Sequence, residues 1–141
     1  MLIIGSVPHL IVEYSGNLAA VVDIDAALAT IHTAAAEHGL PPLDGLRTRG
    51  EPRAHFVIAD GHPSNAFVAV TARVGPGRPA EDKRSFVEAL LQATQRAFAN
   101  PVLDIAYSVE LQEIDPEFRI NVNEIRPKLA ERTRRRAHTD P

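Results

Sequence analysis

The feature that most constrains the fold is a strand-helix-strand pattern that occurs twice along the chain. In the first copy, residues 9–14 read as a short buried strand, and polar residues at 15–17 end it. Asp23 is a good N-cap for a helix whose apolar residues recur at helical spacing. Gly39, followed by two prolines, predicts where this helix ends.

The first copy closes with a second strand around Thr48, which lies between Arg47 and Arg49. Residues 55–59 look like a further short strand or hairpin arm, which Asp60-Gly61 closes. The predicted first unit therefore runs from about residue 8 to residue 59.

The second copy repeats this order between residues 65 and 115. Residues 66–74 alternate as a strand rich in β-branched side chains, and the glycines of residues 75–77 turn the chain. Pro79 marks the start of a helix with acidic residues in its first turn, and Asn100-Pro101 ends it. Residues 105–111 give the closing strand.

Two such units side by side predict an α/β (α+β) fold, with a four-stranded sheet and two helices on one face. We expect one domain over residues 8–126, preceded by an extension at residues 1–7. The central strands read as apolar on both sides, so the other sheet face would be bare. With no third helix expected, another subunit is the obvious cover, which predicts an oligomer.

Charge and composition exclude several classes of protein. There is no cysteine, which removes disulfides, zinc-thiolate sites and thiol nucleophiles. The first 131 residues carry 11 Lys and Arg against 17 Asp and Glu, and an acidic body of this kind argues against nucleic-acid binding. We interpret the basic tail at residues 127–141 as a solvated, frayed end rather than an RNA or lipid contact. No apolar run suits a membrane span or a signal peptide, so we expect a cytoplasmic protein.

Three arginines invite a functional interpretation. Arg47 and Arg49 lie two residues apart on a strand and so share one side of it. Arg78 follows the glycine turn at a helix start, where backbone N–H groups favour an anion. Arginine forks bind carboxylates bidentately, so the three could hold a dicarboxylate. From spacing alone, ordinary surface ion pairing is the more frequent role.

The histidines and carboxylates give weaker signals. His32 and His38 are six residues apart on a helix, which is not the spacing of a metal-binding pair, and we expect no metal site. Glu13 and Glu110 could form a pair of catalytic carboxylates, but solvated strand-end carboxylates are the simpler interpretation.

Four short motifs in register resemble one known family. These are PHLIVEYSGNL at residues 8–18, GLRTR at residues 45–49, DGH with AFV at residues 60–68, and VGPGR at residues 74–78. The chain resembles the 5-carboxymethyl-2-hydroxymuconate Δ-isomerase family of the tautomerase superfamily, from Pro8 to about Asn123. The resemblance implies a homotrimer of paired β-α-β units and an enzyme that needs no metal or organic cofactor.

The resemblance also assigns roles to residues. It implies that Pro8, as an N-terminal secondary amine, is the general base that moves a proton within an unsaturated 2-hydroxy or 2-oxo dicarboxylate. Arg47, Arg49 and Arg78 would bind the substrate carboxylates. Nearby guanidinium groups and an apolar wall disfavour the protonated amine and so keep it basic. The family name suggests a substrate from the breakdown of an aromatic compound.

The residue before Pro8 departs from the family pattern. Pro8 follows Val7, and an acylated proline nitrogen is a tertiary amide without a basic lone pair. Translation could begin at position 7, because a GTG codon reads as Val internally and as Met at a start. Alternatively, a protease or self-trimming could expose Pro8. If residues 1–7 remain, with residues 2–4 adding a short strand, the protein would bind an acidic ligand without tautomerase chemistry.

Overall fold

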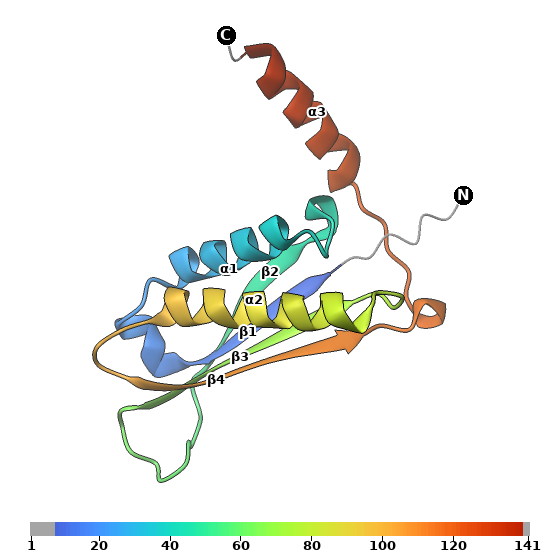
Figure 1. The fold of residues 1–141 in the computed structure, drawn as a ribbon. Helices are drawn as coiled ribbons and strands as arrows, with labels where there is room; N and C mark the ends of the chain where they lie inside the picture. Colours follow the sequence, from blue (N-terminus) through green and yellow to red (C-terminus); the bar gives the residue numbers. More distant parts are fainter. Residues whose placement is uncertain (1–7, 140–141) are drawn as a thin grey trace.

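The computed structural model describes residues 8–139, and the doubled pattern is present as predicted (Figure 1). Each unit consists of two strands joined by a helix. The elements are β1 (His9–Ser15), η1 (Gly16–Ala20), α1 (Ile24–His38), η2 (Leu43–Gly45), β2 (Arg47–Arg53), β3 (Asn65–Val74), α2 (Ala80–Phe98), β4 (Asp104–Glu113), η3 (Pro116–Phe118) and α3 (Ile125–Thr139). The predicted fold class is confirmed, with α3 as an additional helix.

The four strands form one sheet in the order β2-β1-β3-β4. β1 is parallel to β2 and β3 is parallel to β4, whereas β1 and β3 are antiparallel. The starts of β1 and β2 and the ends of β3 and β4 therefore meet at one end of the sheet. Because Pro8 immediately precedes β1, we call this the Pro8 end.

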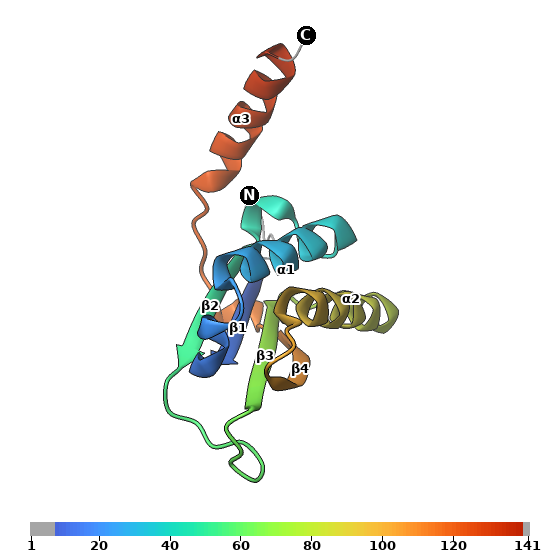
Figure 2. The ribbon, with the colours of Figure 1, turned by 90° about the vertical axis from the view of Figure 1, so that its left-hand side faces the viewer.

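The helices α1 and α2 lie side by side on one face of the sheet (Figures 1 and 2). Every second residue of β3 is buried beneath them, which is the alternation expected of a strand with one covered face. The largest apolar side chains of this layer are fully buried: Leu10, Val12, Ile31, Val68, Val70, Phe86, Leu90 and Phe98. Each contributes about 1.5–3 kcal/mol to stability by leaving water.

The predicted boundaries of α1 are confirmed. The Asp23 carboxylate accepts a hydrogen bond from the backbone N–H of Ala26 at 3.1 Å, which caps the first turn. Gly39 adopts a left-handed conformation with a φ of 82°, and its N–H donates to the carbonyl of Ala35.

The prediction of a strand at residues 55–59 is wrong. This segment belongs to a loop that connects β2 to β3. Ala59 has a φ of 52°, which is incompatible with an extended strand. The Asn65 side chain donates to the carbonyl of Ile58 at 3.0 Å and to the Asp60 carboxylate at 2.8 Å. These contacts stabilise a turn at the end of the loop. The apolar residues of the segment 55–59 alone do not distinguish a loop from a strand.

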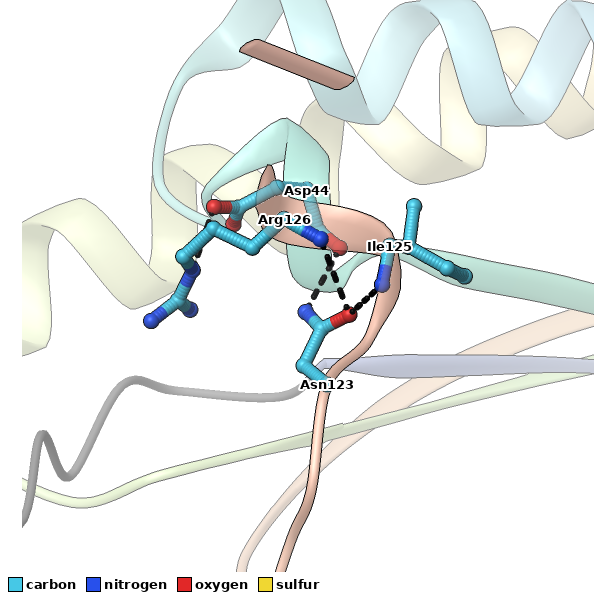
Figure 3. Close-up of polar contacts among 4 residues, drawn as sticks. All are labelled: Asp44, Asn123, Ile125 and Arg126. Carbon is cyan, nitrogen blue, oxygen red and sulfur yellow. Dashed lines mark hydrogen bonds and ion pairs between the residues drawn. The ribbon is translucent and has the colours of Figure 1, made fainter. Parts of the chain in front are cut away.

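The prediction of a frayed tail is also wrong, because residues 125–139 form α3, which projects away from the sheet (Figures 1 and 2). The Asn123 side chain caps this helix by accepting from the N–H groups of Ile125 and Arg126 (Figure 3). Arg126 forms an ion pair with Asp44 at 2.5 Å, and Asn123 donates to the Asp44 carbonyl. Glu131 pairs with Arg135 one turn later. Residues 2–4, for which a short strand is predicted, lie outside the described residues.

The sheet face without helices, which we call the open face, is mixed rather than apolar. On β1 it presents His9, Ile11 and Glu13, and the facing residues of β3 are Asn65, Phe67, Ala69, Thr71 and Arg73. The expectation of an apolar surface was therefore wrong for the Pro8 end, where charged side chains gather. No helix among residues 8–139 is long and apolar enough to cross a membrane.

Candidate active site

Pro8 lies at the sheet end where β1 and β2 begin. Its side chain is fully buried, and its carbonyl accepts a hydrogen bond from the N–H of Arg47 at 3.1 Å. This bond extends the parallel β1–β2 ladder by one residue and fixes Pro8 next to the start of β2. The proline ring is thus held rigidly at the Pro8 end, with Arg47 as its neighbour on β2.

Arg47 and Arg49 both project from the open face. Arg47 pairs with His9 in the β1–β2 register, and Arg49 pairs with Ile11. Thr48, between them, faces the helices and lies 2.8 Å from Nδ1 of His32. The predicted common side of the two arginines follows from this alternation.

His9 lies among arginines on the open face. Arg49 donates a hydrogen bond to Nδ1 of His9 at 3.0 Å, so the neutral ring carries its proton on Nε2. Burial lowers the pKa of His9 below its ordinary value of 6.5, and the positive charges of Arg49, Arg47, Arg73 and Arg119 lower it further. At neutral pH this histidine is therefore an uncharged donor within a positively charged surface.

Arg73 and Arg119 were not identified from the sequence. Arg73 faces His9 across the β1–β3 register, so the alternation of the predicted strand at residues 66–74 contained a signal for it. Arg119 follows η3 and carried no such signal. Its Nη1 is buried without a hydrogen-bond partner among the described residues.

The position of Arg119 follows from the path of the chain. The N–H of Ile114 bonds to the carbonyl of Val74 at the end of β3, and Asn123 bonds to the backbone of Asp44 just before β2. Since β4 and β2 are opposite edges of the sheet, residues 115–122 must pass the ends of β3 and β1. This crossing brings Arg119 to the Pro8 end.

Arg78 lies in the turn between β3 and α2, at the same end of the sheet. Its Nη1 donates to the carbonyl of Leu40, which follows α1. Arg78 thereby ties the end of one helix to the start of the other. Because one of its N–H groups is engaged by this backbone carbonyl, a clamp of Arg78 with Arg47 and Arg49 stays a prediction.

Glu13, Glu110 and His38 have ordinary partners. Glu13 forms an ion pair with Arg53 at 2.5 Å, and Glu110 lies two strands away on β4, where it accepts from Gln112. His38 lies 2.8 Å from the hydroxyl of Ser85. Residues 8–139 contain no group of three or more His, Cys, Asp or Glu side chains that could hold a metal ion.

A cavity of about 220 Å³ lies at the opposite end of the sheet from Pro8, and its lining includes Asn17, Phe56 and Asn65. Its lining contains no Arg or Lys side chain, so it lacks the permanent positive charge expected of a site for an acid.

Comparison with known proteins assigns the family. The sequence model described as 5-carboxymethyl-2-hydroxymuconate isomerase matches residues 8–129. The chain belongs to this isomerase family. It is therefore an enzyme of the isomerase class, and the resemblance inferred from four short motifs is confirmed.

Individual relatives of this isomerase agree with that assignment. The 5-carboxymethyl-2-hydroxymuconate Delta-isomerase of Escherichia coli is 30% identical over 120 residues, which cover 84% of this chain and 95% of the relative. The crystal structure of a 5-carboxymethyl-2-hydroxymuconate isomerase from Deinococcus radiodurans R1 superposes with a TM-score of 0.79 at 28% identity, covering 88% of this chain and 95% of the other. A fused 4-OT symmetric trimer shares the fold, with a TM-score of 0.63 at 24% identity, covering 82% of this chain and 92% of the other.

Proposed function

We propose that this isomerase shifts a proton within an unsaturated 2-hydroxy or 2-oxo acid that carries several carboxylates, such as 5-carboxymethyl-2-hydroxymuconate. The observation that carries the proposal is that the family match begins at Pro8. Residues 1–7 thus precede the matched region, and a match that begins at Pro8 supports the proline base implied by the resemblance. The E. coli relative has this substrate in its name.

The chemistry requires a free Pro8 nitrogen. As a secondary amine, Pro8 would take the proton of the 2-hydroxyl group, and the dienol electrons would move toward the far end of the conjugated system. The protonated amine would then return the proton to a carbon there, which leaves a 2-oxo group. Arg47, Arg49 and Arg78 would bind the carboxylates and stabilise the negative charge that develops in between.

The positive charge at the Pro8 end supports this role. Arg47 lies beside Pro8 on β2, and a guanidinium group near an amine disfavours its protonated form. A buried ring adds to this effect, because desolvation also disfavours the ammonium ion. A neutral amine at working pH is what a base requires.

The test begins with the first residue of the protein. Protein made from the native gene is analysed by intact mass and N-terminal sequencing, and ketonisation of 2-hydroxymuconate is followed by the loss of dienol absorbance. We expect Pro8 to be the first residue and the reaction to be faster with enzyme. Retention of Met1 together with an uncatalysed rate would contradict the proposal.

That second outcome would favour a different function. Pro8 is buried, and in the sequence its nitrogen is acylated by Val7. If residues 1–7 stay attached, the same arginines would make the protein a binder of acidic small molecules without tautomerase activity.

We further propose that the protein is a homotrimer. Phe118, the last residue of η3, is 82% exposed, and Ile120 and Val122, which follow at every second position, are 96% and 81% exposed. Three large apolar side chains in a row in water are typical of a surface that another chain covers. The fused 4-OT protein that shares this fold is a symmetric trimer, which supports the same arrangement here.

Sedimentation velocity tests the oligomeric state. We expect a single species with the mass of three chains at micromolar concentration. Ile120→Asp should shift this species toward smaller mass, because it would place a charge in the apolar contact. A wild-type protein that sediments as a single chain would contradict the trimer.

A further inference from the structure

Arg47, Arg49 and Arg73 surround His9 on the open face, and Arg119 lies at the same end of the sheet, close enough for its charge to act on His9. We call Arg47, Arg49, Arg73, Arg119 and His9 the arginine cluster. Arg47, His9 and Arg73 form a row across β2, β1 and β3, because they are paired in both registers. Neighbouring strands are about 4.8 Å apart, so the two flanking arginines lie within side-chain reach of one ligand. Arg49 adds a third guanidinium from the next row on that face, and it contacts His9 directly.

The charge of the cluster is not neutralised by the described part of the chain. The ion pairs found within residues 8–139 involve Arg53, Lys83, Arg126, Lys128 and Arg135, and none of the four cluster arginines. Glu13, the nearest carboxylate along β1, is already paired with Arg53. Glu110 lies in the row of Arg49 but three strands away, at about 14 Å. Four cations held together without an anion favour the binding of one.

Arg119 gives independent evidence for a missing partner. Its Nη1 is buried and has no hydrogen-bond acceptor among the described residues. A buried donor without an acceptor destabilises the fold, more so when it is charged, so such groups normally have a partner. An anion at the cluster would supply the acceptor.

We propose that Arg73 and Arg119 are further substrate-binding residues, and that the arginine cluster selects acids with three carboxylates over acids with two. The identity of the substrate rests on the proposed function. 5-Carboxymethyl-2-hydroxymuconate carries three carboxylates, and the set of Arg47, Arg49 and Arg78 implied by the resemblance was assigned to a dicarboxylate. Arg73 and Arg119 supply additional guanidinium groups, which can bind a third carboxylate through paired hydrogen bonds.

His9 complements this arrangement. Its neutral ring keeps a donor on Nε2 without adding a fifth charge. The row therefore presents the planar guanidinium of Arg47, the neutral Nε2–H donor of His9 and the guanidinium of Arg73. This arrangement suits carboxylates that are spaced along a flat conjugated acid.

Calorimetric titration of the full chain tests the proposal with two stable probes, tricarballylate (three carboxylates) and glutarate (two carboxylates). We expect Arg73→Gln and Arg119→Gln each to weaken tricarballylate binding by about tenfold or more, and glutarate binding by less. Arg96→Gln is the matched control, because Arg96 is exposed near the far end of α2 on the other face, and it should stay within about twofold of wild type. Equal affinities in Arg73→Gln, Arg119→Gln and Arg96→Gln would overturn the proposal.

A second measurement uses the wild-type chain and so does not depend on how the variants fold. In an NMR titration with tricarballylate, the ring signals of His9 should shift, whereas those of His62 at the opposite end of the sheet should not. Unshifted His9 signals at saturation would overturn the proposal. A second result would also overturn the proposal: Arg73→Gln and Arg119→Gln lose the trimer while their affinity for the probes stays unchanged. The cluster would then pair with acidic side chains of a second copy instead of a ligand.

Failure of this inference can be separated from failure of the proposed function. Probe binding requires no proton transfer and no free Pro8 nitrogen. Selective binding of tricarballylate without ketonisation would refute the proposed function and leave the site intact. Ketonisation at wild-type rates in both Arg→Gln variants, with unchanged probe affinity, would refute the assignment of Arg73 and Arg119 and leave the proposed function intact.

Discussion

Pro8→Ala, in a chain that begins at residue 8, is expected to slow ketonisation of a 2-hydroxymuconate-type dienol by about 10²–10⁴-fold. The alanine amine can still accept a proton, but it lacks the ring that is fully buried in this structure. Without those ring contacts the nitrogen is no longer held at one position relative to the substrate. The measurement is kcat from the loss of dienol absorbance at saturating substrate.

The matched control for this variant is the chain that begins at Met1, in which Pro8 keeps its ring but its nitrogen is acylated. We expect the same loss of kcat with an unchanged affinity for tricarballylate, because acylation removes the base and leaves the arginine cluster in place. Wild-type kcat in Pro8→Ala would show that the proline ring is not needed to position the base, and wild-type kcat in the chain that begins at Met1 would show that another group is the base. The two chains together separate the chemistry of the nitrogen from the packing of the ring.

Leu90→Ala should lower the free energy of unfolding by about 2–5 kcal/mol. Leu90 is fully buried on α2, between the helix and the sheet. Truncation removes apolar burial and leaves a cavity that the rigid sheet below cannot close. Urea denaturation measures the change, at one fixed protein concentration because assembly also contributes to stability.

Leu43→Ala is the control for that change, since Leu43 is 54% exposed in η2. This variant deletes the same atoms at a site where much of the side chain already contacts water. The free energy of unfolding should therefore fall by less than about 1 kcal/mol. If both variants lose the same stability, the helix-covered layer is not the main source of stability, contrary to the burial observed in the structure.

The two faces of the sheet differ in the kind of side chain that they present. The covered face holds the apolar residues that stabilise the domain, such as Leu10 and Val70. The open face holds charged residues such as Arg49 and Arg73, which lower the stability of the isolated fold because their charges repel one another. Concentrating charge on one side of a stable sheet allows a ligand to neutralise it without disturbing the core.

Local patterns were sufficient for most of the fold. Alternation predicted β1 and β3, and helical spacing together with Asp23 and Gly39 predicted α1 and its ends. The failures occurred where the deciding contacts are not local. Residues 55–59 have a strand-like sequence but form a loop held by the Asn65 side chain, and α3 is anchored by Asp44, which lies about eighty residues earlier in the chain.

The sequence by itself determined the two strand-helix-strand units, the family, and the common side of Arg47 and Arg49, because each of these depends on short-range periodicity or on motifs in register. It also predicts Pro8 as the base, which stays a prediction, and the structure adds that the ring is fully buried beside the start of β2. Only the tertiary structure decided which residues join it at the Pro8 end. Arg73 meets His9 because β3 pairs antiparallel with β1, and Arg119 arrives because the chain must cross from one sheet edge to the other. Strand order sets such contacts, and periodicity within a segment contains no information about strand order.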